Sequence, residues 1–227
     1  MTTLPVDSVP PPTPGLRPED LVARYASVPA ANVGDAQDRF GIAVGLGPVW
    51  TGARLAGPAR TVWTRSGDNL YLHRALDAAE PGDVIVVNGH GDLTRALMGD
   101  LIGVRAQRLG VAGFVIDGAV RDAEALGELG LPVFACGVTP AGPYKNEPGR
   151  LDVAVAIGGV VVHPGDMVVA DADGVVVVPR ETAEATLVAA EEIERNEQAK
   201  ARKRPHRTTF HRLVSPYPDR LKLPLEP

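Results

Sequence analysis

The chain has 227 residues, of which 44% are hydrophobic and 22% are charged, and its formal net charge is −5. This composition indicates a globular protein with an aliphatic core, and no apolar run is long enough to cross a bilayer. The single cysteine, Cys136, excludes an internal disulfide framework and predicts a reducing, cytoplasmic compartment. The N-terminal segment has neither a basic start nor an apolar centre, so we expect no secretory signal.

Charge is unevenly distributed along the chain. From Arg195 to the C-terminus there are nine Lys or Arg residues and three Asp or Glu residues, whereas the upstream part has 14 basic and 25 acidic residues. Such a basic end can contact nucleic acid or an acidic neighbouring subunit. We favour the neighbouring subunit, because the body of the chain is acidic and the basic end lacks a platform of aromatic residues.

The first half of the chain alternates predicted helices and strands. Residues 1–15 carry five prolines, which predicts an extended arm, and a helix is expected to begin at Pro18. The next expected elements, in order, are a helix or turn at 35–40, a strand at 59–64, a helix that starts at 67–69 and ends at 79, and a strand at 84–88. They are followed by a flexible loop at 89–92, a helix at 93–109 that Gly99 and Gly103 interrupt, a strand at 113–117, a short helix at 125–129 and a strand at 132–137.

The second half is dense in short strands. Residues 151–179 contain Val-rich runs separated by tight turns, and a long helix is expected from Glu181 to about Lys203. The fold class predicted from these patterns is α/β in a single domain. We expect this domain to cover residues 16–203, with a C-terminal arm at 204–227.

The segment from Gly99 to Asp122 contains the main candidate site. Asp100 begins a predicted helix and Arg121 follows a predicted strand, so one helix and one strand can return both ends to the same sheet edge. Asp122 can supply an oxygen ligand to Mg²⁺ or Mn²⁺, and Arg121 can hold a carboxylate or an enolate. Asp100 can orient water or act as a base. A surface ion pair that closes a turn and an ordinary acidic helix start would explain the same residues.

Other candidates carry weaker signals. Asn69 and Lys145 lie beside turns and can donate to an anionic substrate, although, taken alone, they fit a helix cap and a solvated cation better. Backbone N–H groups at 99–102 can bind an anion at a helix start. The glycine-rich run at 89–91 lacks the following Gly-Lys-Ser/Thr of a P-loop, and the histidines lack zinc-ligand spacing. We expect Cys136 to be a packed thiol.

An Asp that precedes an Arg-Asp pair by twenty intervening residues resembles the signature of the RraA-like family. This family includes the 4-hydroxy-4-methyl-2-oxoglutarate and 4-carboxy-4-hydroxy-2-oxoadipate aldolases. The resemblance extends from about Asp35 to Glu197 and includes the segments TVWTRSGDN, PGDVIVVNGHG, GAVRD and PYKNEPG. The family often has an acid three residues after the Arg-Asp pair, where this chain has Ala125, with Glu124 one position earlier.

The resemblance implies a layered α/β/β sandwich of the swivelling phosphohistidine-domain type. It also implies that Asp122 binds Mg²⁺ or Mn²⁺ directly and that Asp100 acts through water. A glutamate of a neighbouring subunit, Glu197 or alternatively Glu194, would complete the water shell. Arg121 would bind the 2-oxo acid and stabilise its enolate. The substrate contacts implied by the family are Gly99, Asp100, Leu101, Ile102, Arg121, Asn69 and Lys145.

The activity implied by the resemblance is metal-dependent cleavage of a 4-hydroxy-2-oxo diacid to pyruvate and a second oxo acid. Oxaloacetate decarboxylation would be a side activity, because it forms the same enolate. A homotrimer or hexamer is expected, without membrane or nucleic-acid partners. The alternative is a non-catalytic regulator that inhibits an RNA-degrading endonuclease. We favour the enzyme because an inhibitor does not need the combination of Asp100, Arg121 and Asp122.

Overall fold

A computed structural model describes residues 17–203 of the chain. It divides into a unit that ends at Glu194 and a second unit that begins at Arg195, and the fold described below is that of the first unit. The arms predicted at 1–15 and 204–227 lie outside the described residues. Within residues 17–203, no helix combines the length and apolar character needed to cross a membrane.

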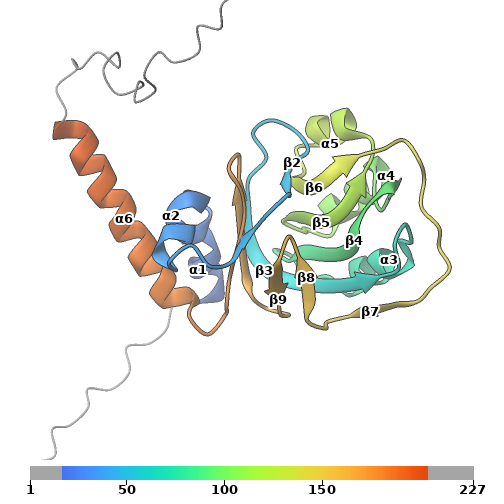
Figure 1. Cartoon of the computed structure of the whole chain (residues 1–227), viewed down its shortest axis with the longest axis horizontal. Helices are drawn as coiled ribbons and strands as arrows, with labels where there is room; N and C mark the ends of the chain where they lie inside the picture. Colours follow the sequence, from blue (N-terminus) through green and yellow to red (C-terminus); the bar gives the residue numbers. More distant parts are fainter. Residues whose placement is uncertain (1–16, 204–227) are drawn as a thin grey trace, which may run out of the picture. The chain divides into compact units, whose positions relative to one another are not determined.

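Parallel strands with intervening helices form the part of the fold that carries the candidate site (Figure 1). The parallel strands, in spatial order, are β3 (Leu55–Thr64), β4 (Val84–Ala96), β5 (Gly113–Val120) and β6 (Val133–Val138). The helices between them are α3 (Leu70–Ala78), α4 (Asp100–Arg108) and α5 (Ala123–Leu129). This βαβ succession confirms the predicted α/β class.

A second layer is antiparallel and shares strand β3 with the first. Residues Leu55–Pro58 of β3 pair with β10 (Met167–Asp171), whereas Ala59–Trp63 pair with β4. In the antiparallel layer, β11 (Gly174–Val178) pairs with β10, and β1 (Ile42–Ala43) pairs with β11. In the parallel layer, β2 (Gly47–Pro48) pairs with β6, and β7 (Gly149–Leu151) pairs with β3. Strands β8 (Val155–Ile157) and β9 (Val160–Val162) form a hairpin.

Alternating side chains along the strands bury three apolar clusters between the layers. Ile85 of β4 packs toward α3, α4 and α5, while its neighbour Val86 packs between the two sheets. In the same way, Val168 of β10 faces the space between the sheets and Val169 faces the outer helices. The resulting layers match the predicted α/β/β sandwich. An outer helical layer is added by α1 (Pro18–Tyr25), α2 (Ala30–Ala36) and the first turns of α6 (Ala183–Lys203).

The loop predicted at 89–92 is wrong, because β4 continues through it to Ala96. The register with β5 shifts after Asn88 and again after Asp92, which accommodates extra residues in the strand. His90 and Gly91 have φ angles of 64° and 65°, so the backbone bulges where the sequence suggested flexibility. Gly89 and Gly91 therefore belong to an irregular strand and not to a loop.

The helix predicted at 93–109 is wrong over its first turns. Residues 93–96 belong to β4, and α4 begins only at Asp100. The N–H of Leu97 donates to Ala119 O at 2.8 Å, which holds this stretch against β5. The helix or turn predicted at 35–40 is mostly a turn: α2 ends at Ala36, residues 37–41 form turns, and the left-handed Asp38 and Arg39 break the helix.

Candidate active site at the start of helix α4

Asp100, Arg121 and Asp122 lie together where β5 ends beside the start of α4. Asp122 Oδ2 accepts the backbone N–H of Asp100 at 3.2 Å, and it lies 3.3 Å from Arg121 Nε. The N–H of Arg121 donates to Met98 O at 2.9 Å, which fixes the loop next to the helix. The helix and strand between residues 100 and 121 thus return both ends to one edge, as the spacing predicted.

Gly99 allows this close approach because it has no side chain. A Cβ atom at Gly99 would lie 2.2 Å from Asp122 Oδ2 and 2.9 Å from Arg121 Cγ. The backbone of Gly99 is extended, with φ of −153°, so the position requires space and not an unusual conformation. Asp122 itself has a φ of 56°, in the left-handed region that Asp enters more readily than most residues other than glycine.

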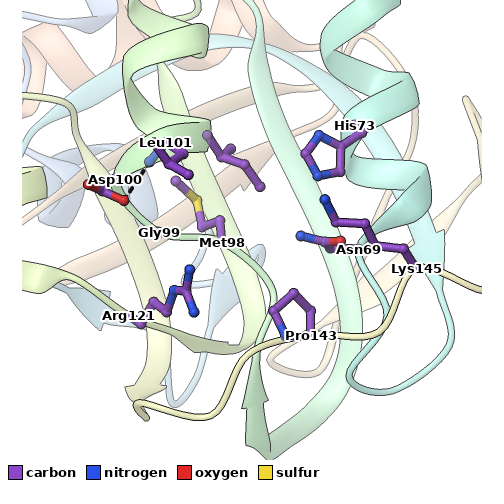
Figure 2. A pocket seen from close by; sticks show the side chains of 10 residues that line it. Asn69, His73, Met98, Gly99, Asp100, Leu101, Arg121, Pro143 and Lys145 are labelled. Carbon is purple, nitrogen blue, oxygen red and sulfur yellow. Dashed lines mark hydrogen bonds between the residues drawn. The ribbon is translucent and has the colours of Figure 1, made fainter.

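The first N–H groups of α4 already bind carboxylates. Besides the contact of Asp100 with Asp122, the N–H of Leu101 donates to Asp100 Oδ1 at 2.7 Å (Figure 2). Negative groups are favoured at a helix start, where N–H groups lack partners within the helix. An anionic ligand that binds Leu101 N–H would therefore replace the Asp100 carboxylate.

A cavity of about 160 Å³ adjoins this cluster. Asp122 is not among its lining residues and contacts the site through Asp100 and Arg121. The predicted residues that line the cavity are Asn69, Gly99, Asp100, Leu101, Ile102, Arg121 and Lys145. The sequence analysis missed three further lining residues, His73, Met98 and Pro143.

Two groups of side chains lie on different sides of this cavity (Figure 2). Arg121 and the start of α4 form one side, and residues of α3 with Lys145 form the other. Asn69 is the residue that precedes α3, and His73 lies one turn later, with its N–H donating to Asn69 O at 3.2 Å. This spacing of four residues brings both side chains to the same side of the helix start and was a signal in the sequence that could have identified His73.

Two buried polar atoms on the α3 side have no hydrogen-bond partner among the described residues: Asn69 Oδ1 and His73 Nε2. Asn69 is only 3% exposed, and its Nδ2 donates to Leu97 O at 3.0 Å. Buried polar atoms normally have partners, so these two are candidates for ligand contacts.

The pKa of His73 is lowered, first by burial and then by the positive charges of Lys145 and Arg105, against an opposing effect of Asp77. The imidazole is therefore expected to be neutral near pH 7. A neutral imidazole offers one donor and one acceptor nitrogen, so Nε2 can bind an uncharged polar group.

Lys145 reaches the cavity from a segment that is tied to the start of α3. Asn69 N–H donates to Tyr144 O at 3.0 Å, and Tyr144 N–H donates to Gly67 O at 2.8 Å. Arg95 donates to the Tyr144 hydroxyl at 2.8 Å, and its guanidinium carbon lies 4.0 Å from the centre of the tyrosine ring. These contacts hold Lys145 on the same side as Asn69.

The donor set is compatible with a divalent cation of the Mg²⁺ type. Such ions commonly use one or two carboxylates and complete their coordination with water and substrate oxygens. Asp122 and Asp100 provide the carboxylates here, although the part of the chain that the structure describes contains no group of three or more His, Cys, Asp or Glu residues suited to hold a metal. Glu197 belongs to the second unit, and its role stays a prediction.

Comparisons with known proteins point to one family. The model of the RraA-like family, described as Aldolase/RraA, matches residues 30–177. A protein of Halalkalibacterium halodurans with the provisional name 4-hydroxy-4-methyl-2-oxoglutarate aldolase is 40% identical over 184 residues, which cover 81% of this chain and 88% of that protein.

Two solved structures show the same fold. One, from Streptomyces coelicolor, is described as an unusual member of the RNase ES inhibitor RraA protein family; it has a TM-score of 0.73 and 33% identity, and the match covers 83% of this chain and 100% of that chain. The other is described as the RNA-processing inhibitor RraA from Thermus thermophilis and has a TM-score of 0.57 and 33% identity. The match covers 73% of this chain and 93% of that chain. The relatives thus carry names of both an enzyme and inhibitors.

Proposed function

The chain belongs to the RraA-like family, and on this premise we propose that it is a divalent-metal-dependent aldolase. Its substrate would be a 4-hydroxy-2-oxo diacid of the 4-hydroxy-4-methyl-2-oxoglutarate type, and its products pyruvate and a second oxo acid. The observation that carries this proposal is the contact of Asp122 with both Asp100 and Arg121 beside the cavity. Two carboxylates and a guanidinium suit a site that holds a cation and stabilises an enolate.

Asp122, Asp100 and Arg121 would have different roles in this reaction. Asp122 would hold the cation, with Asp100 acting through water, and a bound cation would supply positive charge where the enolate oxygen develops. Arg121 would donate to the carboxylate or enolate oxygen of the 2-oxo acid. Asp100 would orient a water that accepts the proton of the 4-hydroxyl as the bond between carbons 3 and 4 breaks.

The same arrangement supports oxaloacetate decarboxylation as a side activity. Loss of CO₂ from oxaloacetate leaves the pyruvate enolate that aldol cleavage also forms. Arg121 would stabilise this enolate in both reactions. Aldol cleavage releases a second oxo acid, whereas decarboxylation releases CO₂. The two reactions therefore require different contacts on the part of the cavity that faces the departing group.

Pyruvate release tests the proposed function. The full chain is incubated with 4-hydroxy-4-methyl-2-oxoglutarate and Mg²⁺ or Mn²⁺, and pyruvate is measured with a coupled dehydrogenase. We expect turnover that a chelator removes and excess Mg²⁺ restores, and a loss of about 10³-fold or more in kcat for Asp122→Ala. Asp38→Asn, an exposed change outside the cavity lining, should retain turnover. Full activity in excess chelator would contradict the metal-dependent proposal.

One structural neighbour is described as a member of the RNase ES inhibitor RraA family and the other as an RNA-processing inhibitor, and these descriptions favour a second candidate function, a non-catalytic regulator. Under this alternative the chain would slow RNA cleavage by an endonuclease of the RNase ES type and would release no pyruvate. An RNA-cleavage assay with and without the chain decides between the two. Inhibition that persists in Asp122→Ala, together with no pyruvate release, would favour the regulator.

A further inference from the structure

We propose that Asn69 and His73 together bind the hydroxyl group on carbon 4 of the substrate. This inference rests on the proposed aldolase function and extends it to the α3 side of the cavity. His73 then becomes a substrate-binding residue that the sequence analysis did not identify.

The two atoms that would bind the hydroxyl are already oriented by the protein. Because Asn69 Nδ2 donates to Leu97 O at 3.0 Å, the amide orientation is fixed and Oδ1 is the atom that lacks a partner. His73 Nε2 is buried on the same helix face and also lacks a partner among the described residues. Both residues line the cavity, and Arg121 lies on its other side (Figure 2).

The chemistry of these atoms selects a hydroxyl over a carboxylate. Asn69 Oδ1 can only accept a hydrogen bond, so its partner must carry a hydrogen. A carboxylate or a keto oxygen has none, whereas a hydroxyl can donate to Asn69 Oδ1 and accept from His73 Nε2–H. Such a ligand satisfies both buried atoms at once.

The surroundings of His73 support this role. Burial is the main cause of its lowered pKa, the positive charges of Lys145 and Arg105 lower it further, and the negative charge of Asp77 opposes them. The ring is then neutral at the pH where the enzyme would work, and Nε2 can carry a hydrogen without adding a further cation to the cavity.

Aldol cleavage changes the bound hydroxyl in a way that engages His73. The O–H proton leaves to water, the C–O bond becomes a carbonyl, and the electrons of the broken C–C bond form the enolate. The hydroxyl turns about its C–O bond as the proton leaves, and Nε2–H stays on the oxygen as negative charge develops. Oxaloacetate has no hydroxyl at this position, so His73 should matter for cleavage and much less for decarboxylation.

The test compares two substrates across matched variants. His73→Phe removes the nitrogen, His73→Gln returns a side-chain donor, and His163→Phe makes the same change at an exposed histidine. We measure kcat/KM for 4-hydroxy-4-methyl-2-oxoglutarate and for oxaloacetate, and thermal unfolding for each variant. We expect His73→Phe to lower cleavage about 100-fold more than decarboxylation, in line with the loss of a donor to a charge-bearing oxygen. His73→Gln should recover part of the loss, and His163→Phe should match the original chain.

Each other outcome has a definite meaning. Equal loss of both activities in His73→Phe and His73→Gln, or no loss, would overturn the hydroxyl assignment and leave the aldolase proposal intact. If the unmodified chain releases pyruvate from neither substrate, the aldolase proposal fails, and calorimetry then compares binding of 4-hydroxy-4-methyl-2-oxoglutarate with 4-methyl-2-oxoglutarate. A preference for the hydroxylated compound that His73→Phe removes would support the hydroxyl site, and equal affinities would overturn it.

Discussion

Asp68 and Asn146 connect two segments that are far apart in the sequence. Asp68 Oδ2 accepts the N–H of Asn146 at 2.6 Å, and Asp68 Oδ1 accepts the N–H of Leu70 at 3.0 Å. The Asp68 side chain is fully buried, and the guanidinium of Arg65 lies 3.8 Å from its Oδ2 atom. One carboxylate therefore ties the segment that carries Lys145 to the start of α3.

Asp68→Asn should weaken this connection and displace Lys145. The change replaces one of the two acceptor oxygens by an NH₂ donor, so one of the two N–H groups then faces a donor, and we expect a loss of about 1–3 kcal/mol in the free energy of unfolding. Pyruvate release should fall mainly through a higher KM, because substrate contacts move. Denaturant unfolding and steady-state kinetics measure both effects. Asp38→Asn, an exposed change away from the cavity, is the matched control; equal behaviour of the two variants would contradict the role of Asp68.

Gly99→Ala should disturb the Asp122 carboxylate with little effect on the rest of the fold. The added Cβ would overlap Asp122 Oδ2, so the carboxylate must leave the N–H of Asp100. We expect a fall of about 100-fold in pyruvate release, as displaced catalytic groups commonly cause. Gly47→Ala is the control, since a Cβ there meets nothing within 4 Å. Normal kinetics in Gly99→Ala would show that the position of Asp122 is not critical.

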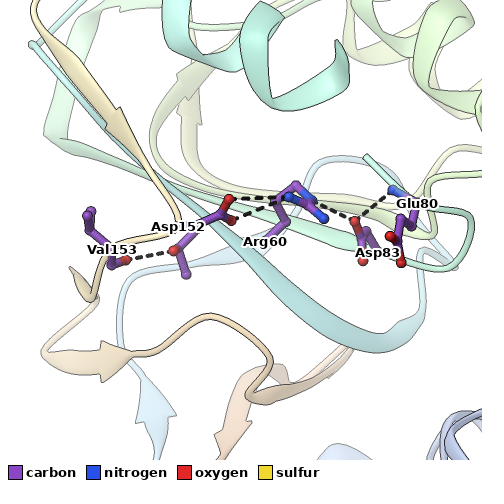
Figure 3. Close-up of polar contacts among 6 residues, drawn as sticks. Arg60, Glu80, Asp83, Asp152 and Val153 are labelled. Carbon is purple, nitrogen blue, oxygen red and sulfur yellow. Dashed lines mark hydrogen bonds and ion pairs between the residues drawn. The ribbon is translucent and has the colours of Figure 1, made fainter. Parts of the chain in front are cut away.

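Arg60 joins β3 to two acidic residues away from the cavity (Figure 3). Its Nε donates to Asp83 Oδ2 at 2.7 Å, and its Nη1 lies 3.4 Å from the Asp152 carboxylate. The side chains of Arg60 and Asp83 are 19% and 11% exposed. Asp83 also accepts the N–H of Glu80, so the cluster holds the turn that leads into β4.

Arg60→Met should destabilise the fold, because it leaves the Asp83 carboxylate without its cation. We expect a loss of about 2–3 kcal/mol, measured by denaturant unfolding. Arg180→Met is the control: its pair with Glu181 is exposed, and a change within about 0.5 kcal/mol is expected. Similar losses of unfolding free energy in both variants would mean that the buried Arg60–Asp83 pair stabilises the fold no more than the exposed Arg180–Glu181 pair does.

Cys136 should react slowly with alkylating reagents in the folded protein. Burial, followed by the hydrogen bond to Asp117 at 3.4 Å, raises the pKa of its thiol to about 11. The raised pKa means that the reactive thiolate is scarce below that pH, with roughly one molecule in a thousand ionised at pH 8. Iodoacetamide labelling followed by mass measurement checks this. Labelling should accelerate in urea, and rapid labelling of the native chain would contradict the prediction.

The sequence predicted the βαβ order and the strand-dense second half because these depend on local patterns. Apolar runs such as Val84–Val87 and turns such as Pro81-Gly82-Asp83 carry their own structural preference. The convergence of residues 100 and 121 also follows from chain geometry, since one helix and one strand separate them. The roles of these residues in metal and substrate binding remain predictions.

Other features depend on contacts between distant residues and were outside the reach of local patterns. The bulged continuation of β4 through His90 is decided by pairing with β5, and the glycines there suggested a loop. Asp68 looked like part of a helix start, and its bond to Asn146 spans 78 positions. His73 was detectable from its spacing to Asn69, but only the cavity shows that both side chains line one wall.

Strand β3 has a consequence for how the protein unfolds. Its first residues, Leu55–Pro58, belong to the antiparallel sheet and its next ones, Ala59–Trp63, to the parallel sheet. Neither sheet can lose this strand without the other, so the two layers should melt as one cooperative unit. The amides in both halves of β3 should then exchange with deuterium at the same, slowest rate in the molecule.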